Sequence, residues 1–372
     1  MEFVKLEDCC EILDSKRIPV TANKRRNGKY PYYGANGLQD YVDDYIFDDE
    51  LVLLAEDGGN FNSKDKPIAY RVSGKCWVNN HAHVLKPKQG ISVDYLCYAL
   101  MYYDVSGLVN GATRQKLTQA TMRKMKIPIL SEIDQLRIVE IMNSIQELKN
   151  DYRSILHKLD VLIKARFIEM FGDPENNPNG WMESPLSEKL SVLGGFAFKS
   201  DKFSEISGIP ILRIGNINSG HFKPVNMVYW KEDENLERYL IYPGDLVMSL
   251  TGTVGKDDYG NVCILGDDFE KYYLNQRNAK LEIQGGINKF YLSQLLKFTQ
   301  VKKKLTGISR GVRQANISNK DILNLVVPIP PIELQQQFED FVHQVDKSRE
   351  AVKKSLEKTQ QLYDSLMQEY FG

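Results

Sequence analysis

The chain has 372 residues, and its 48 lysine and arginine side chains are balanced by 49 aspartate and glutamate side chains. This length is typical of two or three domains. The charge balance excludes a polycation, so nucleic-acid binding would have to depend on local basic patches or on a partner. No uncharged stretch approaches the roughly 20 residues of a membrane-spanning helix, and residues 1–8 lack the basic-then-apolar order of a signal peptide. The five scattered cysteines contain no C-x-x-C pair, which predicts reduced thiols and a cytoplasmic location.

Residues 1–130 form the first predicted globular region, of mixed α and β structure. Leu51–Leu54 is a short apolar run that predicts a buried strand, and Gly34–Gly37 and Asp57–Asn60 predict turns. The segment Tyr95–Tyr103 predicts a helix. These short elements are typical of an α+β domain.

Residues 131–172 form a predicted long helix. Its apolar residues recur at alternating spacings of three and four, which is the period of a coiled-coil seam. Ser131 and Asp134 form a candidate capping box, and Gly172 with Pro174 predicts the end of the helix. The predicted seam consists of Ile138, Ile141, Ile145, Leu148, Tyr152, Ile155, Leu159 and Leu162.

Residues 173–330 form a second predicted globular region, and residues 331–372 a second long helix. Leu246–Ser249 and Leu325–Pro328 predict strands, and Lys289–Lys304 predicts a helix. Serine and threonine residues interrupt the seam of this second long helix, which makes it the weaker of the two. Its predicted seam consists of Phe338, Phe341, Val345, Val352, Leu362 and Leu366.

The two halves of the chain are an internal repeat. Pro128–Ile129 recurs as Pro328–Ile329 and Phe171–Gly172 recurs as Phe371–Gly372, at a constant offset of 200 residues. Each long helix should span roughly 60 Å, and an isolated one would leave a long apolar stripe in water. We therefore predict an α+β fold in which the helices form an antiparallel intramolecular coiled coil with a pseudo-twofold repeat. The alternatives are that each helix packs on its own domain or pairs with a second chain.

Catalytic motifs are not evident in the sequence. It lacks the N/D-P-P-Y/F tetrapeptide with which an adenine methyltransferase would grip its target base. It also lacks a P-loop, because Gly252–Lys256 has the wrong spacing and is followed by Asp257. His81 and His83 near Cys76 and Cys97 could form a zinc site, but hydrogen-bonding loop histidines are the favoured interpretation. We therefore predict a chain with no catalytic residues and no metal.

Basic residues gather in two windows without acidic residues, 105–131 and 283–320, which occupy equivalent places in the two halves. A third group, Lys24–Arg26, lies next to tyrosines in the first half. Lysine and arginine neutralise phosphates, whereas arginine and glutamine also read base edges. The alternative is a solvated basic face. The candidate DNA-binding residues are Lys24, Arg25, Arg26, Arg114, Gln115, Lys116, Arg213, Lys302, Lys303, Arg310, Arg313 and Gln314.

The chain resembles the specificity (S) subunit of type I restriction-modification systems. The resemblance lies in two variable regions, each followed by a long helix that opens with a proline-rich segment and a glutamine. The motif is Val327–Gln335 in the second half and Lys126–Gln135 in the first, where Leu130 and Ser131 replace two prolines. Further support comes from the segments Tyr32–Gly37, Leu53–Asn60, Asn79–Leu85 and Gly244–Met248.

The resemblance implies two target recognition domains, at 1–130 and 173–330, each reading one half of a split DNA site. It also implies that the long helices act as a spacer and as the dock for two methyltransferase (M) subunits, with restriction (R) subunits joining to cut. Extra apolar residues on the first helix, Met142 and Leu156, are the candidate M dock. S-adenosylmethionine and ATP would belong to those partners, with no cofactor in this chain. Because the two regions differ in sequence, the two half-sites should differ as well. The alternative function is a coiled-coil scaffold that binds proteins and not DNA.

Overall fold

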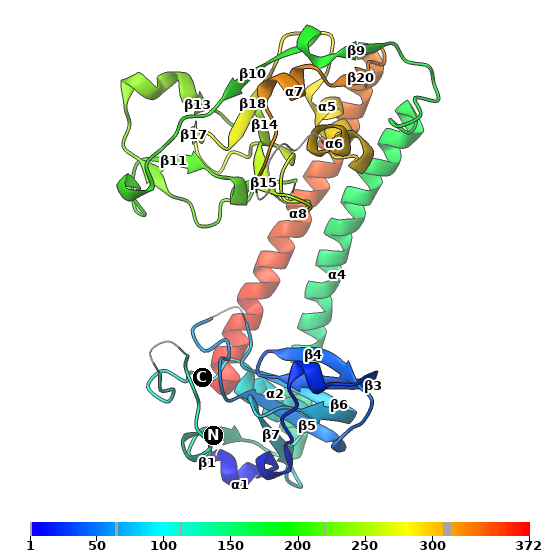
Figure 1. The fold of residues 1–372 in the computed structure, drawn as a ribbon. Coiled ribbons are helices and arrows are strands. Elements are labelled where there is room, and N and C mark those ends of the chain that lie inside the picture. Colours follow the sequence, from blue (N-terminus) through cyan, green and yellow to red (C-terminus); the bar gives the residue numbers. More distant parts are fainter. Residues whose placement is uncertain (1, 64–65, 112–113, 219, 308–313) are drawn as a thin grey trace. The chain divides into compact units, whose positions relative to one another are not determined.

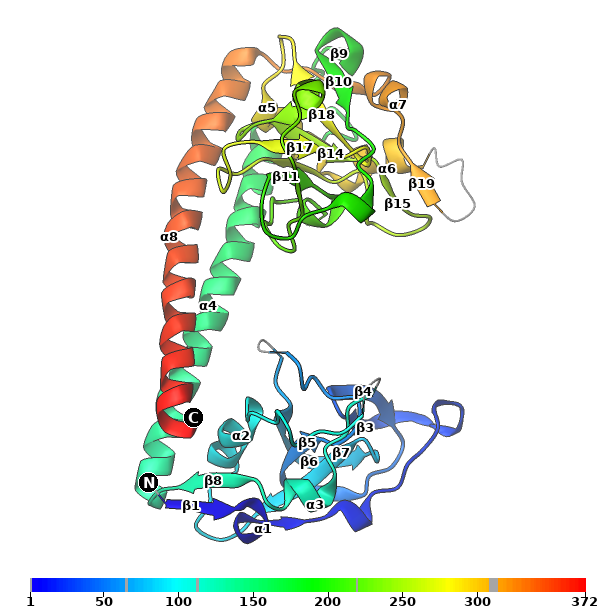
Figure 2. The ribbon, with the colours of Figure 1, turned by 90° about the vertical axis from the view of Figure 1, so that its left-hand side faces the viewer.

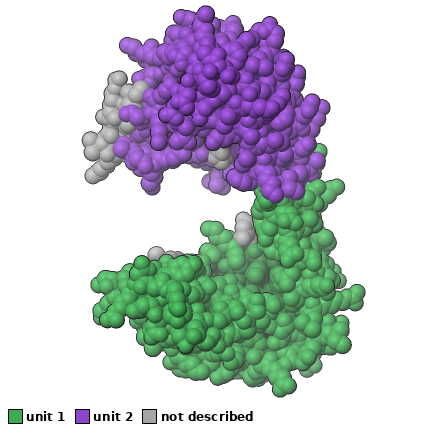
Figure 3. All heavy atoms as spheres, turned by 90° about the vertical axis from the view of Figure 1, so that its right-hand side faces the viewer, with its two compact units in different colours: residues 1–154, 353–372 green, residues 155–352 purple. Residues whose placement is uncertain are grey.

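The computed structural model describes residues 2–63, 66–111, 114–218, 220–307 and 314–372. The chain forms two compact units, unit 1 from residues 1–154 with 353–372 and unit 2 from residues 155–352 (Figure 3). Each unit contains one mixed α and β domain together with one part of each long helix. The predicted division at residues 130 and 330 separates domains from helices, whereas each compact unit combines them. That division therefore stays a prediction.

A six-stranded sheet forms the centre of unit 1 (Figure 1). β3 and β6 run parallel, and the other neighbouring pairs are antiparallel. In β5, Val52 and Leu54 belong to one core cluster, and Leu51 and Leu53 belong to another. Because alternate side chains of a strand point to opposite faces, burial of both faces explains the unbroken apolar run. The strand order is β2 (Cys10–Ile12), β7 (Ala82–Pro87), β5 (Phe47–Ala55), β6 (Ala69–Val78), β3 (Asn27–Gly34) and β4 (Gly37–Val42).

The helix α2 (Val93–Met101) lies between this sheet and the long helices. It packs on β5 and β6, while its Tyr95 and Tyr98 share a core cluster with Met142 and Tyr363 of the long helices. The N-cap Ser92 accepts a hydrogen bond from the Tyr95 amide at 3.4 Å. The other elements are β1 (Glu2–Lys5) paired with β8 (Lys126–Ile129), α1 (Leu6–Cys9), α3 (Gln119–Met122) and the 3₁₀ turns Asp14–Lys16 and Ala22–Lys24.

Unit 2 repeats part of this architecture. The antiparallel order of β10, β18, β14 and β16 reproduces the order of β2, β7, β5 and β6. A second sheet contains β12, β11, β17 and β13, with β11 parallel to β17. The shared strand order supports the duplication seen in the sequence. The strands are β9 (Glu183–Pro185), β10 (Leu190–Gly194), β11 (Ile209–Leu212), β12 (Tyr229–Trp230), β13 (Leu240–Ile241), β14 (Leu246–Ser249), β15 (Thr251–Thr253), β16 (Val262–Ile264), β17 (Tyr272–Leu274), β18 (Asn278–Ile283), β19 (Gln314–Asn316) and β20 (Val326–Pro328).

Three short helices and two small strand pairs complete unit 2. β9 pairs with β20, as β1 pairs with β8 in unit 1, and β15 pairs with β19. The repeat therefore extends to the strand that leads into each long helix. The helices are α5 (Lys289–Leu296), α6 (Thr299–Thr306) and α7 (Asn319–Leu323), and the 3₁₀ turns are Leu186–Glu188, Ser200–Lys202, Ile214–Asn216 and Glu234–Tyr239.

The long helices α4 (Glu132–Phe171) and α8 (Ile332–Phe371) pack together within each unit (Figures 1 and 2). In unit 2, Phe167 near the end of α4 lies against Phe338 near the start of α8, with ring centroids 5.5 Å apart. In unit 1, Lys149 of α4 lies 4.2 Å from the ring centroid of Tyr363 of α8. The helices are therefore antiparallel, and the predicted α+β fold with intramolecular helix pairing is confirmed. Within the part of the chain that the structure describes, neither these nor any other helix is long and apolar enough to span a membrane.

The buried stripe on each long helix differs from the predicted seam. On α4, Ile138 and Ile145 are buried as predicted, but Leu148, Ile155 and Leu162 are exposed, by 41%, 38% and 46%. Ile141, Tyr152 and Leu159 are half-buried. The stripe instead continues through Met142, Lys149, Ile163, Phe167 and Phe171.

The buried stripe on α8 also departs from the predicted seam of that helix. Phe338 and Val345 are buried, and Phe341, Val352 and Leu366 are half-buried, whereas Leu362 is exposed. The stripe runs through Val342, Arg349, Thr359 and Tyr363. An α-helix has 3.6 residues per turn, so a strict heptad pattern drifts about 20° per heptad around a straight helix. Neighbouring residues then replace the heptad positions in the buried stripe.

Each long helix is joined to its domain through a buried glutamine. In unit 1, Oε1 of Gln135 accepts a hydrogen bond from the Ser92 amide at 2.9 Å. Its Nε2 donates to the carbonyl oxygens of Gly90 at 3.0 Å and Leu130 at 2.9 Å. In unit 2, Gln335 accepts from the Asn288 amide at 2.8 Å and donates to the Pro330 carbonyl at 2.7 Å. The repeated glutamine thus fixes the first turn of each helix against the helix N-cap region of its domain.

Candidate nucleic-acid interface

The loop that carries Arg114, Gln115 and Lys116 lies against the end of β5. The Gly58 amide donates to the Gln115 carbonyl at 3.1 Å, and Lys116 forms an isolated antiparallel bridge with Asp57. The backbone thus brings three candidate residues beside the acidic pair Glu56–Asp57. Arg114 and Lys116 are exposed, and Gln115 is half-buried.

Acidic side chains from other segments neutralise much of the first basic window. Nε of Arg114 lies 2.7 Å from Oδ1 of Asp57, and Nζ of Lys116 lies 3.0 Å from Oε1 of Glu56. Arg123 lies 3.6 Å from a carboxylate oxygen of Glu7. A run of basic residues in the sequence is therefore not a uniformly positive surface in the fold. Electrostatic attraction to phosphate at this loop is correspondingly reduced.

The group Lys24–Arg26 begins at the last residue of the second 3₁₀ turn of unit 1. Arg25 is half-buried, with its guanidinium 4.1 Å from the ring centroid of Tyr32 and 3.4 Å from a carboxylate oxygen of Asp40. Its Nε also donates to the Val20 carbonyl at 3.3 Å. Lys24 and Arg26 are exposed. Arg25 thus packs the segment, while its two neighbours face solvent.

The candidates in unit 2 divide between packed and exposed positions. Lys302 on α6 is buried, and its ammonium group pairs with Asp257 and donates to Asn261 at 2.7 Å. Its ammonium group is therefore engaged by the exposed Asp257 and by Asn261, and its role as a DNA contact stays a prediction. Lys303 on the same helix is exposed, and Arg213 is half-buried and donates to the Asn226 carbonyl. The backbone of Gln314 lies in β19, and Arg310 and Arg313 lie outside the described residues.

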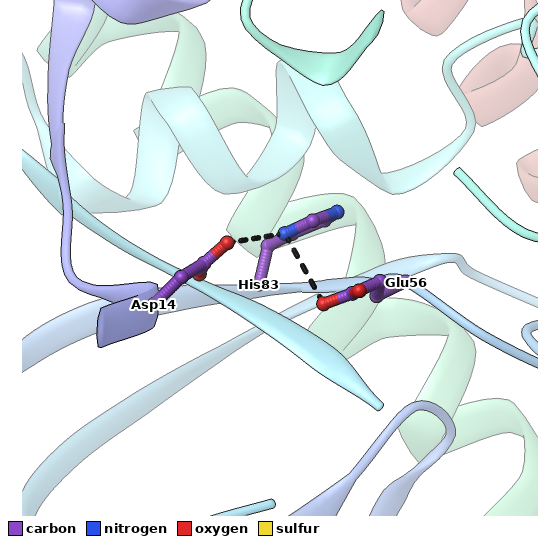
Figure 4. Close-up of side chains that lie close together, drawn as sticks. All are labelled: Asp14, Glu56 and His83. Carbon is purple, nitrogen blue, oxygen red and sulfur yellow. Dashed lines mark hydrogen bonds and ion pairs between the residues drawn. The ribbon is translucent and has the colours of Figure 1, made fainter. Parts of the chain in front are cut away.

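A buried polar cluster lies behind the loop of unit 1, where Asp14 and Glu56 both point toward the imidazole of His83 (Figure 4). Nδ1 of His83 lies 2.6 Å from Oδ2 of Asp14 and 3.6 Å from Oε2 of Glu56. Its Nε2 lies 2.9 Å from the Leu117 carbonyl oxygen, so Nε2 carries a hydrogen and donates. Arg17 closes the cluster, with Nη1 2.6 Å from Glu56.

The carboxyl groups of this cluster, Asp14 and Glu56, are stabilised in their ionised forms by neighbouring donors. Burial opposes ionisation of Asp14, but the hydrogen bond and charge of His83, together with hydrogen bonds from the Val84 amide and Gln119, outweigh burial and lower the Asp14 pKa. Burial likewise opposes ionisation of Glu56, and hydrogen bonds from Arg17 and Lys116 lower its pKa. The cluster thus holds the end of β5, the 3₁₀ turn at Asp14 and the loop around Leu117 together. Sequence reasoning missed Asp14, Arg17 and Glu56, because they come together only through the sheet.

The segment that suggested a zinc site has other partners in the fold. His81 lies 3.4 Å from Asp57, and both ring nitrogens of His83 have the oxygen partners described above. Cys76 and Cys97 are buried, and burial raises the pKa of each thiol to about 12, whereas zinc requires a thiolate. This arrangement fits the favoured interpretation of hydrogen-bonded histidines.

The two residues of the predicted partner dock on α4, Met142 and Leu156, differ in exposure, and the dock stays a prediction. Met142 is fully buried among Tyr95, Tyr98 and Tyr363, so packing on its own unit removes it from the surface. Leu156 is half-buried. Exposed apolar side chains of this part of α4 include three heptad positions that are absent from the buried stripe, Leu148, Ile155 and Leu162, and also Val161.

Comparison with known proteins places this architecture in a family. A family model described as the type I restriction modification DNA specificity domain matches residues 1–156 and 178–361. The chain is 25% identical over 376 residues to a Haemophilus influenzae protein described as a candidate type I restriction enzyme specificity subunit, covering 98% of this chain and 93% of that protein. It is 24% identical over 397 residues to the MjaVIII type I restriction enzyme specificity subunit of Methanocaldococcus jannaschii, covering 98% and 91%. The solved structure of a type I restriction-modification S subunit from M. genitalium has a similar fold, with a TM-score of 0.57 and 14% identity, covering 100% of this chain and 96% of that chain.

Because the family model matches most of its length, the chain belongs to the type I restriction-modification DNA specificity family. It is the DNA specificity subunit of such a system, which is its non-catalytic subunit. The resemblance inferred from the repeated proline and glutamine motif is confirmed.

Proposed function

We propose that the chain reads a split, asymmetric target in double-stranded DNA, with one half-site for each domain. The support is that equivalent backbone positions in the two units carry different side chains. The Leu117 amide donates to the Glu56 carbonyl at 2.8 Å, and the Ile317 amide donates to the Leu250 carbonyl at 2.8 Å. These bonds lie at the same place in the repeat. Glu56 and the following Asp57 stand in unit 1 where Leu250 and the following Thr251 stand in unit 2.

The remaining candidate residues supply phosphate and base contacts in this proposal. Exposed lysine and arginine side chains position the subunit on the backbone, and side chains with two donors read base edges. The candidates are Lys24, Arg26, Arg114, Gln115, Lys116, Arg213 and Lys303, together with Arg310, Arg313 and Gln314. Lys302 stays a prediction, although its side chain is buried.

We propose that two M subunits dock on the long helices and that R subunits join the assembled complex. In unit 2, Ile155 and Leu162 are exposed seven residues apart on α4 and supply apolar surface for such a dock. S-adenosylmethionine and ATP would then be bound by these partners and not by this chain. The five cysteines are free and buried, which supports action in the reducing cytoplasm.

Methylation mapping and DNA binding test the proposal together. Because the formal charge is −1 and several basic side chains are paired, the lone chain should bind DNA weakly, and the complex with M should bind specifically. Methylome sequencing of cells that carry the chain and its M subunit should reveal two short, dissimilar half-sites around an unread spacer. A continuous or palindromic motif, or tight specific binding by the lone chain, would contradict the proposal.

A further inference from the structure

Arg114 is exposed and yet held in place. Its side chain is 59% exposed, but Nε lies 2.7 Å from Oδ1 of Asp57. Nη2 lies 3.5 Å from Nδ1 of His81, and the same ring nitrogen lies 3.4 Å from Oδ2 of Asp57, so Nδ1 either accepts from Arg114 or donates to Asp57. The three side chains come from the end of β5, the turn before β7 and the loop that carries Arg114. An exposed arginine normally samples many rotamers, and fixing one costs conformational entropy, so these contacts orient the guanidinium in advance.

The backbone beneath the guanidinium is fixed as well. Gly58 has a φ of +69°, and a Cβ at this position would lie 3.2 Å from Nε of Arg114. The Gly58 carbonyl accepts from Nδ2 of Asn36 at 3.1 Å, and its amide donates to the Gln115 carbonyl at 3.1 Å. Glycine therefore provides both the left-handed backbone and the room for the guanidinium. A group held by two surrounding segments in this way is preorganised for a directional contact.

The contacts of Arg114 engage one edge of the guanidinium and leave the other edge without a side-chain partner among the described residues. Within the described part of the chain, its polar side-chain partners are Asp57 and His81, which engage Nε and Nη2. Nη1 and the second hydrogen of Nη2 form the end-on edge. Two parallel donors at this spacing match O6 and N7 of guanine in the major groove. A phosphate contact would not require this orientation, because a phosphate accepts from many directions.

We infer that Arg114 reads a guanine in the half-site of unit 1 and that Asp57 is the residue that positions it. This inference rests on the proposed function. It concerns one half-site only, because Leu250 and Thr251 occupy the matching place in unit 2 and have no carboxylate. Asp57 lowers the positive charge of the loop and therefore weakens general attraction to DNA. Its contribution in this inference is to base selectivity, because it orients Arg114.

The test uses the complete complex of the chain with its M subunits. The probes are a duplex that carries the motif methylated by the wild-type complex, and duplexes that change each base pair of that motif in turn. Asp57→Asn should reduce discrimination about tenfold at one G·C pair, leave the other half-site unchanged, and leave affinity for unrelated DNA equal or higher. Arg114→Lys keeps the charge at an exposed position and should lose discrimination at the same pair. Asp8→Asn, the same change at an exposed residue of α1, is the control and should have no effect.

The outcomes separate the inference from the function on which it rests. Full discrimination at every base pair in Asp57→Asn or in Arg114→Lys would overturn the inference. So would an Arg114→Ala complex whose affinity falls for all sequences and whose salt dependence decreases by about one unit of slope, because that is a phosphate contact. If Asp57→Asn weakens M binding or lowers the melting temperature, the role of Asp57 is structural and the inference fails. A wild-type complex without specific binding would instead refute the proposed function itself.

Discussion

Replacing Gln335 by leucine should remove the hydrogen bonds that hold the first turn of α8 to its domain. The side-chain volume changes little, because leucine is similar in size to glutamine. The substitution leaves the Asn288 amide and the Pro330 carbonyl without their partner. The bond to the Pro330 carbonyl is buried and the bond from the Asn288 amide is partly buried; at about 2 kcal/mol and about 1 kcal/mol, their loss predicts a decrease of about 3 kcal/mol in the free energy of unfolding. Gln135→Leu in unit 1 removes three bonds to partly exposed groups. At about 1 kcal/mol each, these predict a similar loss of about 3 kcal/mol.

Urea unfolding with hydrogen exchange measures this effect in each unit separately. Exchange should accelerate in the peptides 288–296 and 332–342 of the Gln335→Leu chain, and in the peptides 92–101 and 132–142 of the Gln135→Leu chain. Gln337→Leu introduces the same change at an exposed position of α8 and is the control. If Gln335→Leu were no less stable than this control, the glutamine would not be what holds the helix to its domain.

Three further predictions concern acid stability, partner docking and target spacing. Burial opposes ionisation of Asp160, but the hydrogen bonds and charges of His221 and Arg349 together outweigh burial and lower its pKa from 3.8 to about 2. Its contribution is therefore complete above about pH 4 and disappears toward pH 2, and Asp160→Asn should remove this part of the acid transition; an unchanged transition would contradict the assignment. Ile155→Glu together with Leu162→Glu should abolish co-purification with M, whereas Lys164→Glu at an exposed position on the opposite face of the same helix should not; retained M binding would place the dock elsewhere. One heptad inserted into both long helices adds about 10 Å and should lengthen the tolerated spacer or abolish binding, whereas an unchanged motif in the methylation map would refute the spacer role.

The sequence alone was sufficient for those features that depend on local patterns. The offset of 200 residues between Pro128 and Pro328 revealed the duplication, and the spacing of apolar residues revealed two long helices. The buried run Leu51–Leu54 predicted the central strand β5. The motif around Gln135 and Gln335 indicated the family, and the structure gives its physical reason, since each glutamine joins a helix to its domain. These features are readable because periodicity and hydrogen-bonding turns are set by residues close together in the chain.

Only the tertiary structure decided which side chains are available for binding. Lys302 and Arg114 both lie in acid-free windows, but folding buries Lys302 and pairs its ammonium group with the exposed Asp257, whereas Arg114 stays exposed and pairs with Asp57. The heptad pattern placed Met142 outside the helix seam, but the side chain is buried in the fold. The same pattern placed Leu148 in the seam, but the side chain is exposed. Charge pairing acts across segments that are distant in the sequence, and the burial of a helix face depends on the true helical repeat and on what packs against it. The amino-acid sequence therefore determined the elements and their family, while the pairing of those elements determined which residues face a partner.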